Sequence, residues 1–235
     1  MRVGPGSGML GRVARGVLWF LAGLLGFSLL WVAAYRIVDP PGTPLMLIRS
    51  LQGAAPLRHD WVPLSAISPN LARAVIGAED TRFCLHAGID WEAVEDAQEY
   101  NRRGRRTRGA STISMQTAKN AFLWPDRTWV RKGAELYFTV LAEFLWDKRR
   151  VMEVYLNIAE WGDGVYGAEA AARTHFGVPA AQLTARQAAL LAAVLPNPRR
   201  WSASRPTGYI QGRAGTILAR MGIVSRDRLD ACLAR

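Results

Sequence analysis

The chain has 235 residues, 50% of them hydrophobic, and its 30 Lys and Arg against 19 Asp and Glu give a formal net charge of +11. The apolar content and the nine tryptophans exclude an intrinsically disordered chain, and the composition excludes collagen-like and disulfide-rich scaffolds. The length suits one domain of ordinary size, or a smaller domain with an appendage. The basic surplus favours a polyanionic partner, such as nucleic acid, anionic lipid headgroups or a phosphorylated substrate.

The cysteines and histidines match no metal-site spacing. Cys84 and Cys232 can pair in an oxidising compartment, but two free thiols are the favoured interpretation. The sequence contains neither a P-loop nor a GxGxxG motif, so nothing in it indicates nucleotide chemistry.

Residues 17–34 (VLWFLAGLLGFSLLWVAA) carry no charge. A helix of about 20 apolar residues crosses the hydrocarbon core of a bilayer, so this segment is a candidate membrane anchor. Arg2, Arg12 and Arg15 precede it, whereas only Arg36 follows it closely. The excess of positive charge before the segment predicts a cytoplasmic N-terminus and an exported remainder of the chain.

A cleaved signal peptide is the alternative interpretation of this segment, since residues 32–34 (VAA) form an acceptable cleavage sequence. The apolar run is longer than the usual signal-peptide core of about 7–15 residues, so an uncleaved anchor is favoured. The proline-rich stretch at 39–44 (DPPGTP) predicts a short, stiff spacer after the anchor.

From about Ile67 onward, helix signals dominate. Ser68 followed by proline predicts one helix start, Asp90 another, and Thr128 a third. Further starts are predicted at Asp147, with a helix that runs to residues 161–164 (WGDG), and at Thr184, which opens a capping box before an apolar run that Pro196 stops. No convincing run of alternating strands is present, so the exported part is predicted to be all-α, or mainly α.

Residues 79–88 (EDTRFCLHAG) place two adjacent carboxylates, Glu79 and Asp80, at the end of a hydrophobic helix. A carboxylate beside apolar groups can act as a general base near neutral pH. A solvated helix end is the structural alternative. Acids at a helix C-terminus oppose the helix dipole, which moderately favours a functional role.

Residues 109–120 (GASTISMQTAKN) predict a helix capped by Ser111. One face of this helix is entirely polar, and its members are Thr112, Gln116, Lys119 and Asn120. Such a face suits an oligosaccharide or a phosphate, and a half-exposed surface helix is the alternative.

Two further stretches join charged residues at helical spacing. Arg131 and Glu135 are either a simple ion pair or a phosphate-binding arginine beside a second cleft carboxylate. Glu153 and Asn157 share a helix face and are interpreted as structural residues that brace helices. The arginine-rich run at 101–108 is interpreted as a basic loop near an anionic membrane or substrate.

In this order and after one anchor, these stretches resemble the family 51 glycosyltransferases, the peptidoglycan polymerases. The family patterns are ED-x2-F-x2-H-x-G, GAST-I-x2-Q-x2-KN, RK-x2-E and K-x2-(I/V)-(L/M)-E-x-YLN, and residues 79–88, 109–120, 131–135 and 148–157 meet them in full. Residues 195–198 (LPNP) are similar to the closing motif of the family. Because the chain ends at Arg235 without a transpeptidase domain, the resemblance is to the monofunctional biosynthetic transglycosylases.

The resemblance implies a lysozyme-like all-α fold with a jaw-like lobe near the membrane. The organisation that follows is a cytoplasmic tail at 1–16, an anchor at 17–35, a membrane-proximal linker at 36–62, a glycosyltransferase domain at 63–201, and a C-terminal helical extension of the same domain at 202–235.

The resemblance also implies the reaction and the partners. The reaction is polymerisation of lipid II into β-1,4 glycan strands, with inversion at the sugar carbon and release of undecaprenyl diphosphate. The partners are lipid II, the polyprenyl-diphosphate-linked glycan, the membrane and, less directly, division or elongation proteins, but not nucleic acid. The expected location is the bacterial inner membrane with a periplasmic catalytic domain.

By the resemblance, Glu79 is the general base and Glu135 is the second catalytic carboxylate, which works through a divalent cation (Mg²⁺ or Mn²⁺) or by orienting basic groups. No cofactor is otherwise implied. The expected substrate-binding residues are Asp80, Phe83, His86, Thr112, Gln116, Lys119, Asn120, Arg131 and Lys132. Two alternatives remain open at this point: an anchored muramidase or lytic transglycosylase, and a non-enzymatic scaffold of the cell-wall machinery.

Overall fold

The computed structural model describes residues 6–53, 55–104, 109–126 and 128–234, with side chains from residue 11 onward. It divides into two compact units, Met1–Val38 and Asp39–Arg235. The first unit holds α1 (Gly6–Ala34), in which Gly11–Ala34 is long and apolar enough to cross a membrane. Its length and composition fit the predicted anchor.

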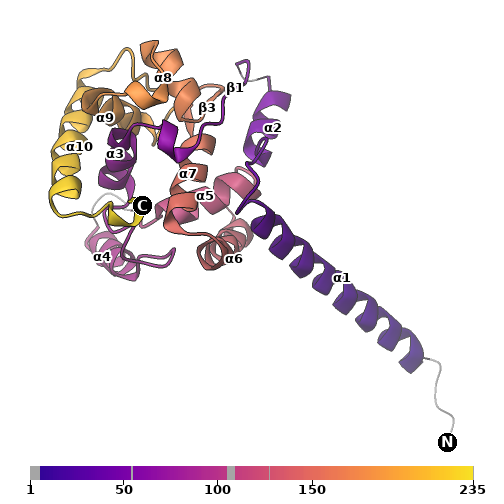
Figure 1. Cartoon of the computed structure of the whole chain (residues 1–235). Coiled ribbons are helices and arrows are strands. Elements are labelled where there is room, and N and C mark those ends of the chain that lie inside the picture. Colours follow the sequence, from indigo (N-terminus) through magenta and orange to yellow (C-terminus); the bar gives the residue numbers. More distant parts are fainter. Residues whose placement is uncertain (1–5, 54, 105–108, 127, 235) are drawn as a thin grey trace, which may run out of the picture. The chain divides into compact units, whose positions relative to one another are not determined.

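The second unit is mainly helical, as the sequence predicts (Figure 1). We call it the catalytic unit after the glycosyltransferase domain that the resemblance implies. Its α-helices are α2 (Pro44–Leu51), α3 (Pro69–Glu79), α4 (Trp91–Arg102), α5 (Ile113–Phe122), α6 (Trp129–Leu145), α7 (Lys148–Ile158), α8 (Ala168–Phe176), α9 (Ala185–Val194) and α10 (Gly208–Arg226). Short 3-10 turns are η1 (Leu64–Ala66), η2 (Ala180–Gln182) and η3 (Ala231–Leu233).

Helix caps explain why many of these elements begin where they do. Asp90, Thr128, Asp147 and Thr184 each accept a hydrogen bond from the backbone N–H three residues later, and the Thr184 capping box is complete. These four predicted helix starts are confirmed. Ser68 does precede α3, but its hydroxyl donates to Leu183 O at 2.9 Å rather than capping the helix.

The predicted cap of α5 is wrong by one residue. Thr112, not Ser111, is the N-cap, and its Oγ1 accepts a hydrogen bond from Met115 N at 3.1 Å. The same hydroxyl donates to Gly88 O at 2.5 Å, which anchors the cap to the preceding loop. Ser111 is exposed and lies just outside the helix.

A small sheet replaces the predicted helix end at 161–164. β2 (Glu160–Gly162) pairs antiparallel with β3 (Val165–Tyr166), and β3 pairs in parallel with β1 (Arg58–His59), which gives the order β1-β3-β2. α7 ends at Ile158, and Gly164 turns the chain at a φ of +71°. An added Cβ at Gly164 would lie 2.6 Å from Ala55 O, so this tight reversal requires glycine.

Two groups of helices form the core. α3, α9 and α10 pack on one another, and α5 packs on both α6 and α7. The largest fully buried side chains include Trp161, Tyr155, Tyr166 and Phe83. The end of α3 and the start of α5 meet between these groups, which places the first two sequence motifs together.

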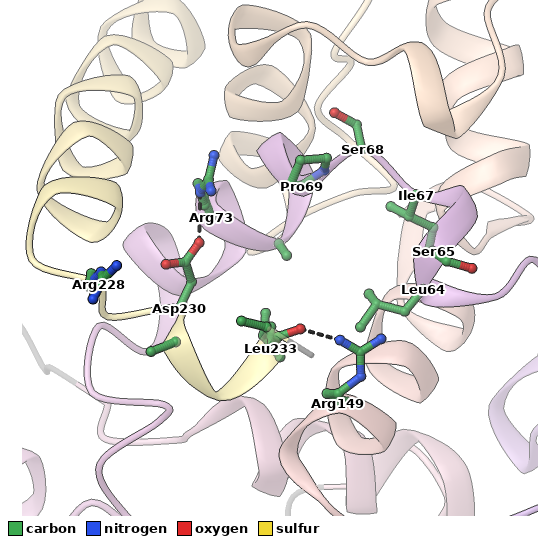
Figure 2. Close-up of a pocket in the computed structure, with 13 residues that line it drawn as sticks. Leu64, Ser65, Ile67, Ser68, Pro69, Arg73, Arg149, Arg228, Asp230 and Leu233 are labelled. Atoms are coloured by element: carbon green, nitrogen blue, oxygen red, sulfur yellow. Dashed lines mark hydrogen bonds and ion pairs between the residues drawn. The ribbon is translucent and has the colours of Figure 1, made fainter.

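After α10 the chain turns back at Arg228, which has a φ of +54°, and residues 228–234 lie along the catalytic unit (Figure 2). Asp230 pairs with Arg73 Nε of α3 at 2.7 Å, and Leu233 O accepts a hydrogen bond from Arg149 of α7. We call residues 228–234 the C-terminal strap. It borders a pocket of about 760 Å³ whose walls also come from η1 and the start of α3.

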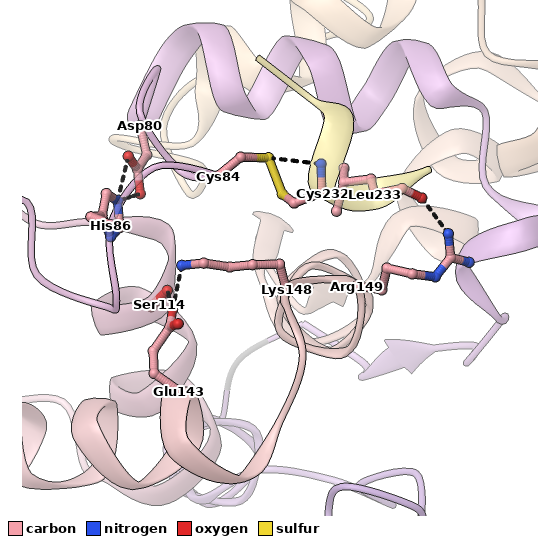
Figure 3. The surroundings of a disulfide bond; sticks show 9 residues. All are labelled: Asp80, Cys84, His86, Ser114, Glu143, Lys148, Arg149, Cys232 and Leu233. Carbon is pink, nitrogen blue, oxygen red and sulfur yellow. Dashed lines mark hydrogen bonds and ion pairs between the residues drawn. A yellow bond between two sulfur atoms is a disulfide. The ribbon is translucent and has the colours of Figure 1, made fainter. Parts of the chain in front are cut away.

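The strap also carries a covalent link, because Cys232 and Cys84 form a disulfide with a Cα–Cα distance of 5.5 Å (Figure 3). The expectation of two free thiols is therefore wrong. The two cysteines are 148 residues apart, and only the return of the chain after α10 brings them together. Sequence spacing carries no signal of such a pairing.

Candidate active site

The site is built around Glu79, the last residue of α3. Its Oε2 accepts a hydrogen bond from Gln116 Nε2 of α5 at 2.8 Å. Gln116 is oriented in turn by Tyr155 of α7, whose hydroxyl lies 3.4 Å from Gln116 Oε1. Three helices thus converge on one carboxylate, whose side chain remains 17% exposed.

Tyr155 is fully buried, and burial raises the pKa of its phenol well above the ordinary value, with the charges of Glu79 and Asp80 adding to the effect. The phenol therefore stays protonated and can only donate to the Gln116 carbonyl oxygen. This donor fixes the amide so that its NH₂ group faces Glu79.

Asp80 lies beside Glu79 but has a different environment. It is buried, its carboxylate contacts His86 Nε2 at 3.0 and 3.1 Å, and its Oδ2 accepts from Ile113 N at 3.0 Å. The carboxylate thereby satisfies a free N–H at the start of α5, where its charge also suits the helix dipole. Asp80 joins the loop after α3 to the helix that carries Gln116.

The loop at 80–88 is held by contacts along its length, and we call it the catalytic loop because it follows the predicted general base, Glu79. Phe83 is fully buried, and Lys148 Nζ lies 4.5 Å from the centre of its ring. Lys148 also pairs with Glu143 at 2.7 Å (Figure 3). Gly88 has a φ of +87°, and an added Cβ there would lie 2.8 Å from Glu143 Cγ, so glycine lets the loop pack closely on α6.

A cleft of about 940 Å³ opens at Glu79. Its lining includes four of the predicted residues: Glu79, Asp80, Thr112 and Gln116. Phe83 and His86 are not among the described residues that line it; Phe83 is fully buried, and the His86 side chain is only 6% exposed. The acid–amide pair therefore faces an open space large enough for part of a sugar substrate.

Arg213 of α10 also lines this cleft, although no sequence motif indicates it. Its Nη2 lies 3.8 Å from Glu79 Oε1, and its Nε is buried with no hydrogen-bond partner among the described residues. Arg220, from the same helix, also lines the cleft and donates to Gly77 O at 3.2 Å. A lone arginine in a helical pattern gives no sequence signal of this role.

A second charged cluster lies on α6. Glu135 is buried and is held between Arg131 Nη1 and Lys132 Nζ, each at 2.5 Å from one of its two oxygens. Arg131 Nε is buried and has no hydrogen-bond partner among the described residues. Because two cations occupy both carboxylate oxygens, this arrangement does not fit a divalent metal at Glu135 and does fit the orientation of basic groups.

Lys119 of α5 and the cluster on α6 are not among the described residues that line the cleft, but the charge of Lys119 is influenced by both carboxylates. Burial lowers the pKa of its ammonium group; Glu135 opposes this shift, and Arg131 and Lys132 add to it. Glu79 also influences it, so the lysine lies within electrostatic reach of both carboxylates. Asn120 is half-buried at the next position of the helix. A buried, incompletely neutralised cation cluster of this kind suits an anionic ligand.

Glu153 and Asn157 of α7 hold the segment before η1. Glu153 accepts from Leu64 N at 2.7 Å, while the Asn157 amide exchanges hydrogen bonds with the N–H and C=O of Val62 at 3.0 and 2.9 Å. These bonds serve packing rather than the cleft. The arginine-rich run at 101–108 lies in part outside the described residues, which exclude 105–108.

Comparison with known proteins agrees with the motifs. Residues 46–222 match the model of the transglycosylase family. The protein named biosynthetic peptidoglycan transglycosylase in Rhodospirillum centenum is 64% identical, over 96% of this chain and 97% of the relative. The protein of the same name in Caulobacter vibrioides is 50% identical, over 96% of this chain and 100% of the relative. The one in Pseudomonas putida strain W619 is 51% identical, over 92% of each chain. The chain belongs to the transglycosylase family.

Proposed function

We propose that the catalytic unit polymerises lipid II with Glu79 as the general base. The enzyme class follows from the family and from the relatives: the chain is a peptidoglycan glycosyltransferase of cell-wall synthesis. Lipid II and the growing glycan are accordingly its substrates.

In the proposed step, the 4-hydroxyl of an acceptor N-acetylglucosamine attacks C1 of the N-acetylmuramic acid at the end of the growing chain. The new C1–O bond forms as the bond from C1 to the diphosphate oxygen breaks, the hydroxyl proton passes to Glu79, and undecaprenyl diphosphate leaves. Attack from the face opposite the leaving group converts the α-linkage into a β-linkage. A sugar hydroxyl is a weak nucleophile, so removal of its proton in the transition state is a chemical requirement.

The environment of Glu79 supports this role. Gln116 donates a hydrogen bond to Oε2 of Glu79, and Arg213 Nη2 lies 3.8 Å from its Oε1, so the side chain is held in a fixed position at the cleft. The cleft gives the acceptor access to the acid, whereas Asp80 is buried and fully engaged in contacts that hold the loop and α5. Glu79, rather than its neighbour, is therefore the base.

We assign the cluster of Lys119, Arg131 and Lys132 to the diphosphate of the donor. Negative charge grows on this group as it leaves, and cations fixed in advance stabilise that charge. In this proposal Glu135 holds Arg131 and Lys132 in place through its two short contacts and carries no metal.

The expected location is the inner membrane, with a single span, a cytoplasmic N-terminus and a periplasmic catalytic unit. The apolar helix fits the anchor, and the arginines before it fit this orientation. The Cys84–Cys232 disulfide gives independent support, because disulfides persist in the periplasm and are rare in the cytosol.

The test is incubation of the full-length, detergent-solubilised protein with labelled lipid II, with the products separated on a gel. We expect glycan polymer from the wild type, none in the presence of moenomycin, and a loss of about 10²–10⁴-fold in rate for Glu79→Gln. Glu95→Gln, an exposed acid of α4, is the matched control and should retain full activity. Equal polymer from Glu79→Gln would remove Glu79 as the base, and cleavage of preformed glycan without lipid II consumption would indicate a muramidase.

A further inference from the structure

The C-terminal strap and the catalytic loop are joined at one point. Cys84 lies in the catalytic loop, directly after the buried Phe83 and two residues before His86, and its sulfur is bonded to Cys232 of the strap. Cys232 N also donates a hydrogen bond to Cys84 Sγ at 3.3 Å. The bridge therefore ends among the residues that hold Asp80 and the start of α5 (Figure 3).

The other described polar contacts of the strap are weaker. The Arg73–Asp230 pair has side chains that are 33% and 20% exposed, and partly exposed ion pairs contribute little to stability. The second contact is the hydrogen bond from Arg149 to the backbone oxygen of Leu233. Both lie at the pocket between the strap, η1 and α3 (Figure 2). Without the disulfide, the strap would depend on these two contacts and on the packing of η3 against α7.

We propose that Cys84 and Cys232 are an oxidation site, and that closure of this disulfide completes the catalytic unit by fixing the catalytic loop behind Glu79. The inference rests on the proposed function, in which Glu79 is the base and the catalytic unit is exported. Cys84 and Cys232 act as positioning residues, because neither lines the cleft in the described part of the chain.

The reaction requires an oxidant of defined class. The two thiols lose two protons and two electrons, and the disulfide of a thiol–disulfide oxidoreductase accepts them and becomes a dithiol. The exchange runs through a mixed disulfide, which the second cysteine of this chain resolves. Cys84 and Cys232 are both half-buried, so the oxidant must act before the strap has docked fully.

The first experiment measures the redox state of the full-length protein in membranes. Thiols are trapped with acid and labelled with a mass-adding maleimide, before and after reduction. We expect no label before reduction and two labels after it. Two labels without reduction would overturn the proposal.

The second experiment compares Cys84→Ser, Cys232→Ser and the double variant with the wild type, in melting temperature and in the rate of lipid II polymerisation. Each change only opens the bridge, so all three should behave alike. We expect a melting temperature lower by about 5–15 °C, because the bridge closes a long loop. We also expect a several-fold lower kcat, with little change in KM, at temperatures where every variant is folded. Reduction should affect only the wild type.

Two further variants distinguish the effect of the disulfide from the effects of a polar substitution and of the ion pair in the strap. Leu57→Ser places a hydroxyl at an exposed position outside the catalytic loop and the strap, and should match the wild type. Asp230→Asn should have little effect with the disulfide closed and a large effect in the Cys84→Ser background, because the ion pair then becomes a main tether of the strap. Independent, additive losses for Cys84→Ser and Cys232→Ser, or a Cys84→Ser protein equal to the wild type, would refute the inference.

The outcomes also distinguish this inference from the proposed function. If the oxidised wild type makes no polymer, the proposed function fails, while labelling and melting still decide whether the bridge exists and stabilises the fold. If the wild type is active and insensitive to reduction, only the role of the disulfide fails. Glu79→Gln should keep both the disulfide and the melting temperature of the wild type.

Discussion

Lys119 is a cation of the site whose pKa depends on its surroundings. Its pKa is lowered by burial, and the neighbouring Arg131 and Lys132 act in the same direction. A bound diphosphate would favour the ammonium form, since an anion beside a cation stabilises its charge. Donor binding and protonation of Lys119 are therefore coupled, and each strengthens the other.

This coupling predicts the alkaline limb of the pH profile. As the pH rises through the lowered pKa of Lys119, the free enzyme loses the ammonium charge, and kcat/KM for lipid II should decrease. This decrease should occur at a lower pH than the titration of an ordinary lysine, which has a pKa of 10.5. Lys119→Arg keeps its charge and should move this fall to higher pH. Rates measured from pH 7 upward, with melting temperatures at each pH, test this prediction. An unchanged alkaline limb in Lys119→Arg would contradict it.

The sequence motifs indicate which residues belong to the candidate site, but not which of them contact one another. Glu79 and Gln116 belong to separate motifs, and only the fold brings their side chains into hydrogen-bonding distance. Arg213 and Tyr155 complete the surroundings of Glu79, but α10 and α7 reach this point only through packing. Contacts between distant segments leave no local pattern, which is why the sequence alone does not show them.

At the scale of elements, Asn157 shows how one side chain connects a helix to an irregular segment. Its amide exchanges two hydrogen bonds with Val62 and donates a third to Glu153 O at 2.8 Å, and the side chain is fully buried. These bonds hold the chain just before η1 against α7. They give the segment a fixed backbone path without regular secondary structure.

Asn157→Leu should therefore destabilise the protein strongly. Leucine is similar in size, but it leaves the N–H and C=O of the half-buried Val62 without their side-chain partner, which costs about 1–3 kcal/mol of the free energy of unfolding. Thermal or denaturant unfolding of the full chain in detergent measures this loss. Gln182→Leu, at an exposed position of η2, is the matched control and should change stability by less than about 0.5 kcal/mol. Similar stabilities for the two variants would show that the Val62 bonds are not needed.

Helix starts that depend on neighbouring residues can be predicted from the sequence, whereas strands that depend on pairing with a distant segment cannot. The helix starts at Asp90, Thr128, Asp147 and Thr184 depend on side chains within the first turn, and the structure confirms them. The strands are only two or three residues long, and β1 pairs with a strand far along the chain. Such short strands have too few residues for an alternating pattern. The sequence therefore does not indicate β2, and the predicted helix end at 161–164 is placed too late, since α7 ends at Ile158.

At the scale of the whole molecule, α6 presents an apolar face to solvent. Trp129, Val130, Val140 and Phe144 are 91%, 77%, 56% and 84% exposed. Soluble proteins rarely expose large apolar side chains together, and such a face with basic residues nearby is typical of a surface that lies in the membrane interface. Arg131 and Lys132 on the same helix could then meet a diphosphate at the level of the headgroups.

This arrangement predicts a membrane-dependent defect when the face is made polar. Trp129→Ser combined with Phe144→Ser should raise KM for lipid II in phospholipid vesicles several-fold and leave kcat little changed, because the serines remove apolar contact between α6 and the bilayer interface. In detergent micelles, where the bilayer interface is absent, the difference from the wild type should shrink. Leu218→Ser with Ile223→Ser, a matched pair of partly exposed apolar residues on α10, should leave KM unchanged in both settings. If the α10 pair raises KM as much as the α6 pair, or if the α6 pair acts equally in micelles and vesicles, then α6 does not bind the membrane surface.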